Sequence, residues 1–188
     1  LPTKRTRIED DEMTFENAWA VCDQDLFNKV LKITDEKAEK KQPFFSFVMT
    51  SSNHKPYTYP DNVVDTPSGT SVVGSIKYLD KSLREFLEKA KTKSWYKNTV
   101  FVIMSDHCGF SAGRTEINVE NHHIPAFILN LQNQEPKKIT KLSSQIDIFP
   151  TLFGYLNWSY KTALYGKDIN KMQINDERAF IGNHRKVG

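Results

Sequence analysis

The pattern of apolar and polar positions along the chain predicts one long helix and three buried strands. Between residues 70 and 91, apolar side chains recur at spacings of three and four, which is typical of an amphipathic helix. The runs "FFSFVM" (44–49), "TVFVIM" (99–104) and "IPAFILNL" (124–131) are short, apolar and rich in β-branched or aromatic residues. Such runs, bounded by turn residues, are typical of buried strands.

Two shorter helices complete the predicted order of elements. They are expected at 23–31 and 144–156, with Asp23 and Asp147 as their caps. Residues 179–181 are a candidate for a last short strand. Apolar strands joined by helices are typical of an α/β fold in which the sheet is covered on both faces.

The composition indicates a folded domain and excludes few functional classes. Of the 188 residues, 38% are hydrophobic and 26% are charged, which is ordinary for a folded domain. The net charge is +3 and the Lys-rich stretches 37–41 and 89–93 are typical of solvated helix faces, so no nucleic-acid partner is expected. No run reaches the roughly 18 apolar residues of a membrane span. Because the chain begins with Leu1, we expect a fragment or a processed product, and its location stays open.

Side chains that commonly bind metals stand where the predicted strands end. His54 follows the first strand, and Asp106 and His107 follow the second. In open α/β sheets the active site lies at the carboxyl ends of the strands, so parallel neighbours would bring these three side chains together. His123 precedes the third strand and could close over the same edge. A carboxylate and imidazoles are normal ligands of Zn²⁺ or Mn²⁺, which activate oxygen nucleophiles.

Each of these features also has an ordinary structural explanation. An Asp-His pair after a strand can simply cap a loop, and only the joint pattern favours a metal site. The D-x-D at 23–25 opens a predicted helix, so capping is favoured over metal binding. The hydroxyls of 50–52 and the Cys108 thiol lack the sequence context of a nucleophile.

Several stretches, in their order, resemble the sulfatase/alkaline-phosphatase superfamily, and in particular its phosphoglycerol transferases of the lipoteichoic acid synthase and periplasmic glucan types. The matching stretches are "AWAVCDQDLF" (18–27), "PFFSFVMTSSNHKPYTYP" (43–60), "SIKYLDKSLREFL" (75–87), "WYKNTVFVIMSDHCG" (95–109), "HHIPAFIL" (122–129), "SQIDIFPTLFGYL" (144–156) and "RAFIGN" (178–183). The resemblance implies an alkaline-phosphatase-like α/β sheet flanked by helices, here incomplete at its N-terminal side. Residues 1–14 would be a polar lead-in, 15–183 the C-terminal part of a catalytic domain, and 184–188 a tail.

The resemblance also implies roles for individual residues. Asp106 and His107 match the pair that ligates the catalytic metal, which is Mn²⁺, Mg²⁺ or Zn²⁺ in the family. His54 matches a catalytic histidine that contacts the substrate phosphate or the leaving group. Further substrate-binding positions are matched by Trp19, His123 and Arg114, and His123 could instead serve a second metal.

The family's nucleophilic Thr or Ser, and the acidic metal ligand before it, have no match in this chain. We therefore expect half of a metal site, and no turnover by the 188 residues alone. In the intact protein, a Thr would attack an anionic donor of the phosphatidylglycerol type, and a glycan or polyol hydroxyl would accept the phosphoglycerol group. The resemblance implies a bacterial cell-envelope protein on the outward-facing side of the inner membrane, anchored through an N-terminal region absent from this chain.

Two other functions stay open. A sulfatase or phosphodiesterase fragment would have the same metal ligands, and a Cys/Ser-x-Pro-x-Arg motif upstream would identify a sulfatase. A non-catalytic domain that binds glycan or a partner is disfavoured by the intact Asp106 and His107. The sequence also does not decide whether Cys22 and Cys108 pair.

Overall fold

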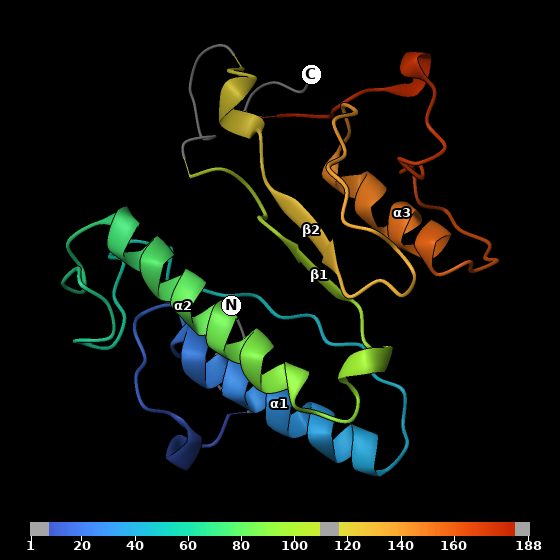
Figure 1. Ribbon diagram of the computed structural model, residues 1–188. Helices are drawn as coiled ribbons and strands as arrows, with labels where there is room; N and C mark the ends of the chain where they lie inside the picture. Colours follow the sequence, from blue (N-terminus) through green and yellow to red (C-terminus); the bar gives the residue numbers. More distant parts are fainter. Residues whose placement is uncertain (1–7, 110–116, 183–188) are drawn as a thin grey trace. The chain divides into compact units, whose positions relative to one another are not determined.

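The computed structural model describes residues 8–109 and 117–182, and the chain divides into two compact units. Unit 1 is Leu1–Asn98 and consists of helices and loops (Figure 1). Unit 2 is Thr99–Gly188 and contains a small sheet, one short α-helix and long connecting loops. Neither long helix in the described part of the chain has the apolar length that a bilayer crossing needs.

Unit 1 is built on the packing of two helices, α1 (Asp23–Glu39) and α2 (Val72–Lys91) (Figure 1). The rings of Phe27 and Phe86 stack between them with centroids 5.0 Å apart. The 3-10 turns η1 (Asp10–Glu12) and η2 (Tyr96–Asn98) flank this pair in sequence. The two predicted helices at these places are therefore confirmed, and the first continues well past residue 31.

The buried side of α2 differs from the predicted apolar face. The small residues Gly74, Ser75 and Ser82 are buried, whereas Val73 and Ile76 are more than half exposed. Small side chains let the neighbouring segments approach closely: a Cβ on Gly74 would stand 2.2 Å from the hydroxyl of Tyr59. Of the predicted apolar face, Ala90 is buried, while Val73 and Ile76 are not, so the hydrophobic spacing predicts only part of the buried side of α2.

The core of unit 1 lies under the start of α1. Cys22, Tyr59 and Tyr78 form a buried cluster, and the two tyrosine rings stack with centroids 5.1 Å apart. Cys22 is the residue that precedes α1, and it makes no side-chain cap to the helix. The prediction that Asp23 caps α1 is therefore wrong, since Asp23 is the first helical residue and its carboxylate binds another segment.

Unit 2 contains the sheet, in which β1 (Phe101–Met104) and β2 (Ala126–Leu129) pair in antiparallel register. Both strands were predicted, and their existence is confirmed. Because Met104 is opposite Ala126, the carboxyl end of β1 lies beside the start of β2. The remaining elements are η3 (Glu120–His122), η4 (Gln145–Asp147), α3 (Ile148–Tyr155) and η5 (Ile174–Asp176). Asp147 is the residue before α3, as predicted, but its side chain makes no cap hydrogen bond to that helix, because its carboxylate binds Ser144, Lys167 and Arg178 instead.

Two strand predictions are wrong for the described chain. Residues 44–49 and 179–181 are in no β-ladder. A strand requires a neighbouring backbone for its hydrogen bonds, and neither segment has such a partner among the described residues. The alternate residues Phe45, Phe47 and Met49 are 78%, 73% and 65% exposed, so this run has strand-like alternation without a ladder. β1 and β2 are only partly buried, which also differs from the expected sheet covered on both faces.

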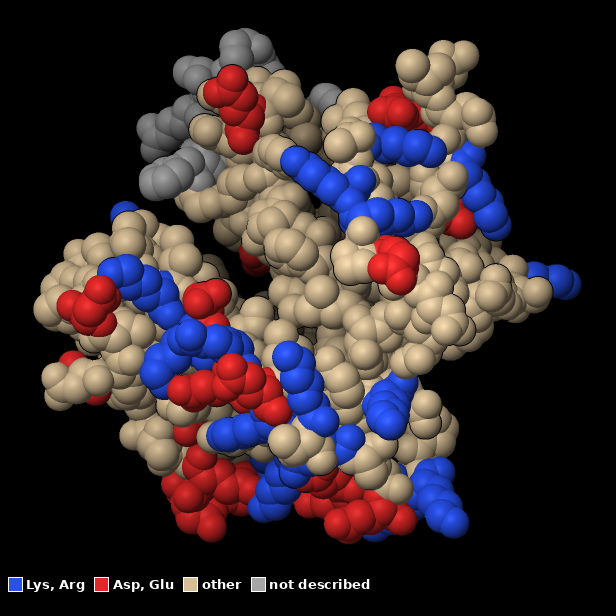
Figure 2. Space-filling view, viewed as in Figure 1, with Lys and Arg blue, Asp and Glu red and all other residues tan. Residues whose placement is uncertain are grey.

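The charged side chains of unit 1 are mixed by sign. Figure 2 shows Lys and Arg interleaved with Asp and Glu over the visible face of the α1–α2 pair. Ion pairs account for part of this mixing, including Lys29 with Glu12 at 2.5 Å and Lys93 with Asp35 at 2.6 Å. On this face, neighbouring charges of opposite sign offset one another.

Candidate active-site residues

Trp19 and His54 lie together in unit 1, although they are distant in sequence. Their rings stack with centroids 4.4 Å apart and an angle of 24° between the planes. The indole Nε1 of Trp19 donates a hydrogen bond of 2.6 Å to the carbonyl of Lys55, which follows His54. Both side chains are exposed, and we call this pair the Trp19–His54 platform.

Hydrogen bonds at either end join the two loops that carry the platform. At one end, Asn17 donates to the Thr58 hydroxyl at 3.1 Å and accepts from the Trp19 N–H at 2.8 Å. At the other end, Oδ1 of Asp23 accepts from the N–H groups of Ser51 and Ser52 at 3.1 and 3.3 Å. The backbone segments that carry Trp19 and His54 are therefore held by hydrogen bonds, although the two rings are exposed.

Asp23 is fully buried, and its second oxygen, Oδ2, has no hydrogen-bond partner among the described residues. Burial raises the pKa of the Asp23 carboxyl, and the hydrogen bonds from Ser51 and Ser52 lower it by less. The D-x-D at 23–25 is not a metal motif in this arrangement. Asp25 instead accepts from the Thr14 N–H at 2.7 Å and so fixes the segment before α1.

In unit 2, Asp106 and His107 project from the loop that follows β1. Asp106 Oδ2 lies 3.5 Å from His107 Nε2, and both side chains are more than half exposed. The other ring nitrogen of His107, Nδ1, lies 3.0 Å from the carbonyl oxygen of Cys108. A carbonyl can only accept, so Nδ1 is the donor in this contact, and Nε2 is the ring nitrogen that lies beside the carboxylate.

The antiparallel register brings His123 to the same end of the sheet. The Cys108 thiol donates to the His123 carbonyl at 3.1 Å, and the Ser105 N–H donates to the Pro125 carbonyl at 3.3 Å. His122 faces other groups, since its ring nitrogens lie 2.7 and 3.2 Å from the carbonyls of Asn118 and Gly182. We call residues 105–108 with His123 the Asp106 corner.

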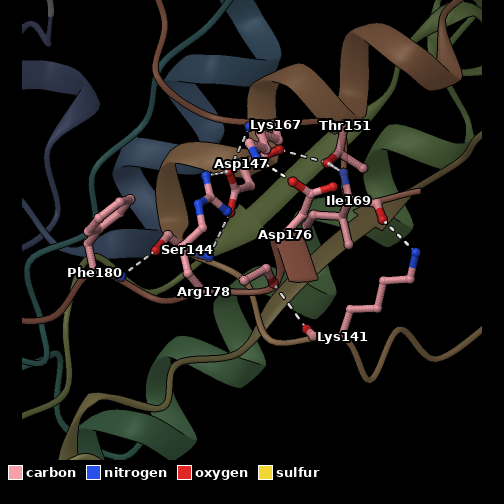
Figure 3. A network of polar contacts seen from close by, with 10 residues as sticks. Lys141, Ser144, Asp147, Thr151, Lys167, Ile169, Asp176, Arg178 and Phe180 are labelled. Carbon is pink, nitrogen blue, oxygen red and sulfur yellow. Dashed lines mark hydrogen bonds and ion pairs between the residues drawn. The ribbon is translucent and has the colours of Figure 1, made fainter. Parts of the chain in front are cut away.

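A polar network centred on the buried Asp147 lies behind this corner. Gln145 donates from Nε2 to the carbonyls of Ser105 and Asp106, at 3.0 and 3.1 Å. Gln145 is in η4, whose last residue, Asp147, is fully buried and forms a two-pronged ion pair with Arg178 (Figure 3). Burial alone would raise the pKa of Asp147, but hydrogen bonds from Arg178, Lys167 and Ser144 outweigh it and hold the pKa below its usual range.

The Asp106 corner fits a divalent metal ion in part. A carboxylate oxygen and an imidazole Nε2 lie side by side, and the His107 Nδ1 contact orients the ring as carbonyls do around metal sites. In residues 8–109 and 117–182, no group of three or more His, Cys, Asp or Glu side chains could hold an ion. The two side chains are therefore suitable as part of a ligand set.

The structure groups the predicted site residues into two sets. Trp19 and His54 meet in unit 1, and Asp106, His107 and His123 lie at one sheet end in unit 2. Convergence of the two sets stays a prediction. Arg114 lies outside the described residues.

The sequence interpretation missed Asn17, Asp23 and Gln145 as residues that hold the site. Asp23 was considered only as a helix cap and a metal motif. Asn17 and Gln145 belong to no recognisable motif. The sequence offers only a general indication of their role, which is that a polar residue lies near a candidate loop.

Comparison with solved structures defines the class of fold. A protein of the alkaline phosphatase superfamily from Vibrio parahaemolyticus superposes with a TM-score of 0.86 at 33% identity, covering 94% of this chain and 44% of that one. The lipoteichoic acid synthase LtaP from Listeria monocytogenes gives a TM-score of 0.69 at 24% identity, covering 86% of this chain and 45% of that one. The fold is thus an alkaline-phosphatase-superfamily α/β fold, of which the described residues form a part.

The chain belongs to the sulfatase family, which it matches over residues 2–158. Among curated relatives, the lipoteichoic acid synthase-like YvgJ of Bacillus subtilis is 28% identical over 177 residues, covering 81% of this chain and 28% of that protein. Lipoteichoic acid synthase 2 of the same species is 30% identical, covering 68% of this chain and 23% of that protein. The chain thus spans less than a third of the length of these relatives.

Proposed function

We propose that this chain is the C-terminal part, residues 15–183, of a metal-dependent phosphoglycerol transferase domain. The donor would be an anionic phospholipid of the phosphatidylglycerol type, and the acceptor a glycan or polyol hydroxyl. The similarity to lipoteichoic acid synthases supports this class of reaction. The observation that carries the proposal is the geometry of His107, whose Nε2 lies 3.5 Å from an Asp106 carboxylate oxygen.

Asp106 and His107 would hold the divalent ion, which is Mn²⁺, Mg²⁺ or Zn²⁺. Such an ion, when bound, supplies positive charge that stabilises a phosphoryl oxygen and lowers the pKa of an attacking hydroxyl. Gln145 orients the corner, since it binds the carbonyls of Ser105 and Asp106. His123 would orient the substrate from the neighbouring strand start, and Arg114 would contact a phosphate oxygen.

His54 would act on the transferring group. Among the described residues, neither ring nitrogen of His54 has a hydrogen-bond partner, so each can meet a phosphate or a leaving oxygen. The stacked Trp19 holds the imidazole plane and offers apolar surface to the substrate. His54 would thereby stabilise the phosphoryl group or protonate the oxygen that leaves.

We place the Thr nucleophile and the remaining metal ligands outside these 188 residues. The isolated chain would then bind an ion weakly and would not turn over. The natural protein would act on the outward-facing side of the inner membrane of a bacterial cell envelope, and its membrane anchor would lie outside this chain.

The test uses the natural protein that contains this chain, assayed with fluorescent phosphatidylglycerol and, in parallel, with an aryl sulfate. We expect release of fluorescent diacylglycerol. It should fall more than about a hundredfold in Asp106→Ala, because even outer-shell partners of a metal are worth 10–100-fold. Asp80→Ala, which removes an exposed carboxylate on α2, is the matched control and should retain activity.

Hydrolysis of the aryl sulfate without cleavage of the lipid would replace the proposal with a sulfatase function. Equal lipid cleavage by wild type and Asp106→Ala would remove the metal role of Asp106.

A further inference from the structure

We propose that Asp23 is a positioning residue that holds the His54 loop in place and thereby keeps the His54 ring against Trp19. Asp23 belongs to α1 and makes no contact with either ring of the platform by hydrogen bond. It would act through the backbone of Ser51 and Ser52, to which it is bonded. The use of the platform in catalysis rests on the proposed function, whereas its geometry does not.

A continuous series of hydrogen bonds joins Asp23 to His54. Oδ1 of Asp23 accepts from the N–H groups of Ser51 and Ser52 at 3.1 and 3.3 Å. The Ser51 carbonyl then accepts from the His54 N–H at 3.1 Å. The His54 carbonyl accepts from the Tyr57 N–H at 2.7 Å, which closes the turn behind the ring. A displacement of Ser51 is therefore transmitted directly to the backbone of His54.

The burial of Asp23 has no explanation within its own helix. Its side chain is fully buried and one oxygen is without a partner in the described part of the chain, an arrangement that costs free energy. The residue before it, Cys22, has the N-cap position, and the carboxylate accepts from residues 51 and 52 instead of the first turn of α1. Helix capping therefore does not account for the carboxylate, and anchoring of the loop does.

The opposite end of the platform is held independently. Asn17 binds both the Trp19 N–H and the Thr58 hydroxyl, and Trp19 Nε1 binds the Lys55 carbonyl. Loss of Asp23 would therefore release the backbone of residues 51–54, while Trp19 stays bonded to Asn17 and to the Lys55 carbonyl. The predicted defect is a displaced imidazole in an otherwise folded unit.

The test follows the histidine ring by NMR in the 188-residue chain. The chain has five histidines, and His54→Gln assigns the resonance of interest. Stacking on Trp19 at 4.4 Å should displace the His54 ring protons upfield through the indole ring current. In Asp23→Ala we expect that upfield displacement to be lost. Asp23→Asn should retain most of it, because Oδ1 still accepts both N–H groups.

Asp25→Ala is the matched control. Asp25 is also buried in the first turn of α1, but it accepts from Thr14 and Phe15, on another segment. It should lower stability and leave the His54 resonance in place. A folded Asp23→Ala chain with an unchanged His54 resonance would overturn the proposal, as would an equal shift in Asp25→Ala.

Amide hydrogen exchange in the wild-type chain gives a readout that does not depend on a variant's folding. The Ser51 and Ser52 amides lie outside any helix or ladder, so protection of about tenfold or more would require the buried acceptor. Unprotected Ser51 and Ser52 amides would contradict the anchoring role. Failure of lipid cleavage by the natural protein that contains this chain, with the His54 stack intact, would instead count against the proposed function alone.

Discussion

Each unit of the chain has a fully buried aspartate behind an exposed histidine, and the two aspartates differ in how they are satisfied. Asp147 in unit 2 accepts from both Arg178 nitrogens at 2.7 and 2.8 Å, and from the Lys167 N–H at 2.8 Å. Among the described residues, Asp23 in unit 1 accepts from the Ser51 and Ser52 amides on one oxygen, and its other oxygen has no partner.

The difference explains why the pKa values of the two buried carboxyls are shifted in opposite directions, although burial raises both. At Asp23 burial dominates and the pKa is raised, whereas at Asp147 the hydrogen bonds and the Arg178 charge outweigh burial and the pKa is lowered. A buried carboxylate with a full set of partners contributes to stability. A buried carboxylate with partners on only one oxygen costs stability, and its role is to fix the position of the segment that it binds.

The largest expected effect comes from breaking the fully paired site. Arg178→Ala would leave the Asp147 charge buried without its partner, and such a change costs about 3 kcal/mol of unfolding free energy, at the lower end of the range for buried pairs. Urea denaturation of the 188-residue chain measures it. Lys167→Ala removes only an exposed partner of Asp176 and should change stability little. Similar losses in both variants would show that Asp147 does not depend on Arg178.

A second contrast concerns the two cysteine thiols, one in each unit. Cys22 is buried and burial raises its pKa, whereas Cys108 is partly exposed in the Asp106 corner. The thiolate is the reactive form, so Cys108 should be alkylated at least about tenfold faster than Cys22 in the folded chain. Mass spectrometry of iodoacetamide-treated chain at pH 8 measures both rates. In urea the rates should converge, and a fast Cys22 in the folded chain would mean that the unit 1 core is open.

The smallest effect is a difference in the sign of pH dependence. The native pKa of Asp147 lies below the usual value of 3.8, so its contribution is present above that value and is lost as the pH falls through the native pKa. The native pKa of Asp23 lies above 3.8, so its contribution is present below that value and is lost as the pH rises through the native pKa.

Unfolding free energies between pH 3 and pH 7 test this sign. Relative to wild type, Asp23→Asn should gain stability as the pH rises, and Asp147→Asn should lose it. Parallel curves for the two variants would show that the two burial sites are electrostatically alike.

The sequence predicted the local elements of this fold well, because their causes are local. Spacings of three and four identified α2, and β-branched runs identified β1 and β2. The run 44–49 failed because a strand depends on a partner backbone, which its own residues do not specify. Asp147 was placed correctly before α3, but its partner Arg178 is 31 residues away and no pattern links the two.

The candidate site residues were likewise predictable only where their causes are local. His54, Asp106 and His107 could be selected because they follow apolar runs, as metal and catalytic residues do in α/β folds. The contact between Trp19 and His54 could not be predicted, since side-chain bonds of Asn17 and Asp23 to distant loops produce it. Hydrogen bonds between loops carry no periodicity, and this is why the residues that support the site were missed.

The most direct test of the account is a Mn²⁺ titration of the 188-residue chain, followed by electron paramagnetic resonance of the free ion. Because Asp106 and His107 supply only part of a ligand set, we predict weak binding that is lost in Asp106→Ala and in His107→Ala. His54→Ala, which changes the platform in the other unit, should bind the ion as wild type does. Equal affinity of wild type and Asp106→Ala would contradict the assignment of the Asp106 corner as the metal-binding part of the site.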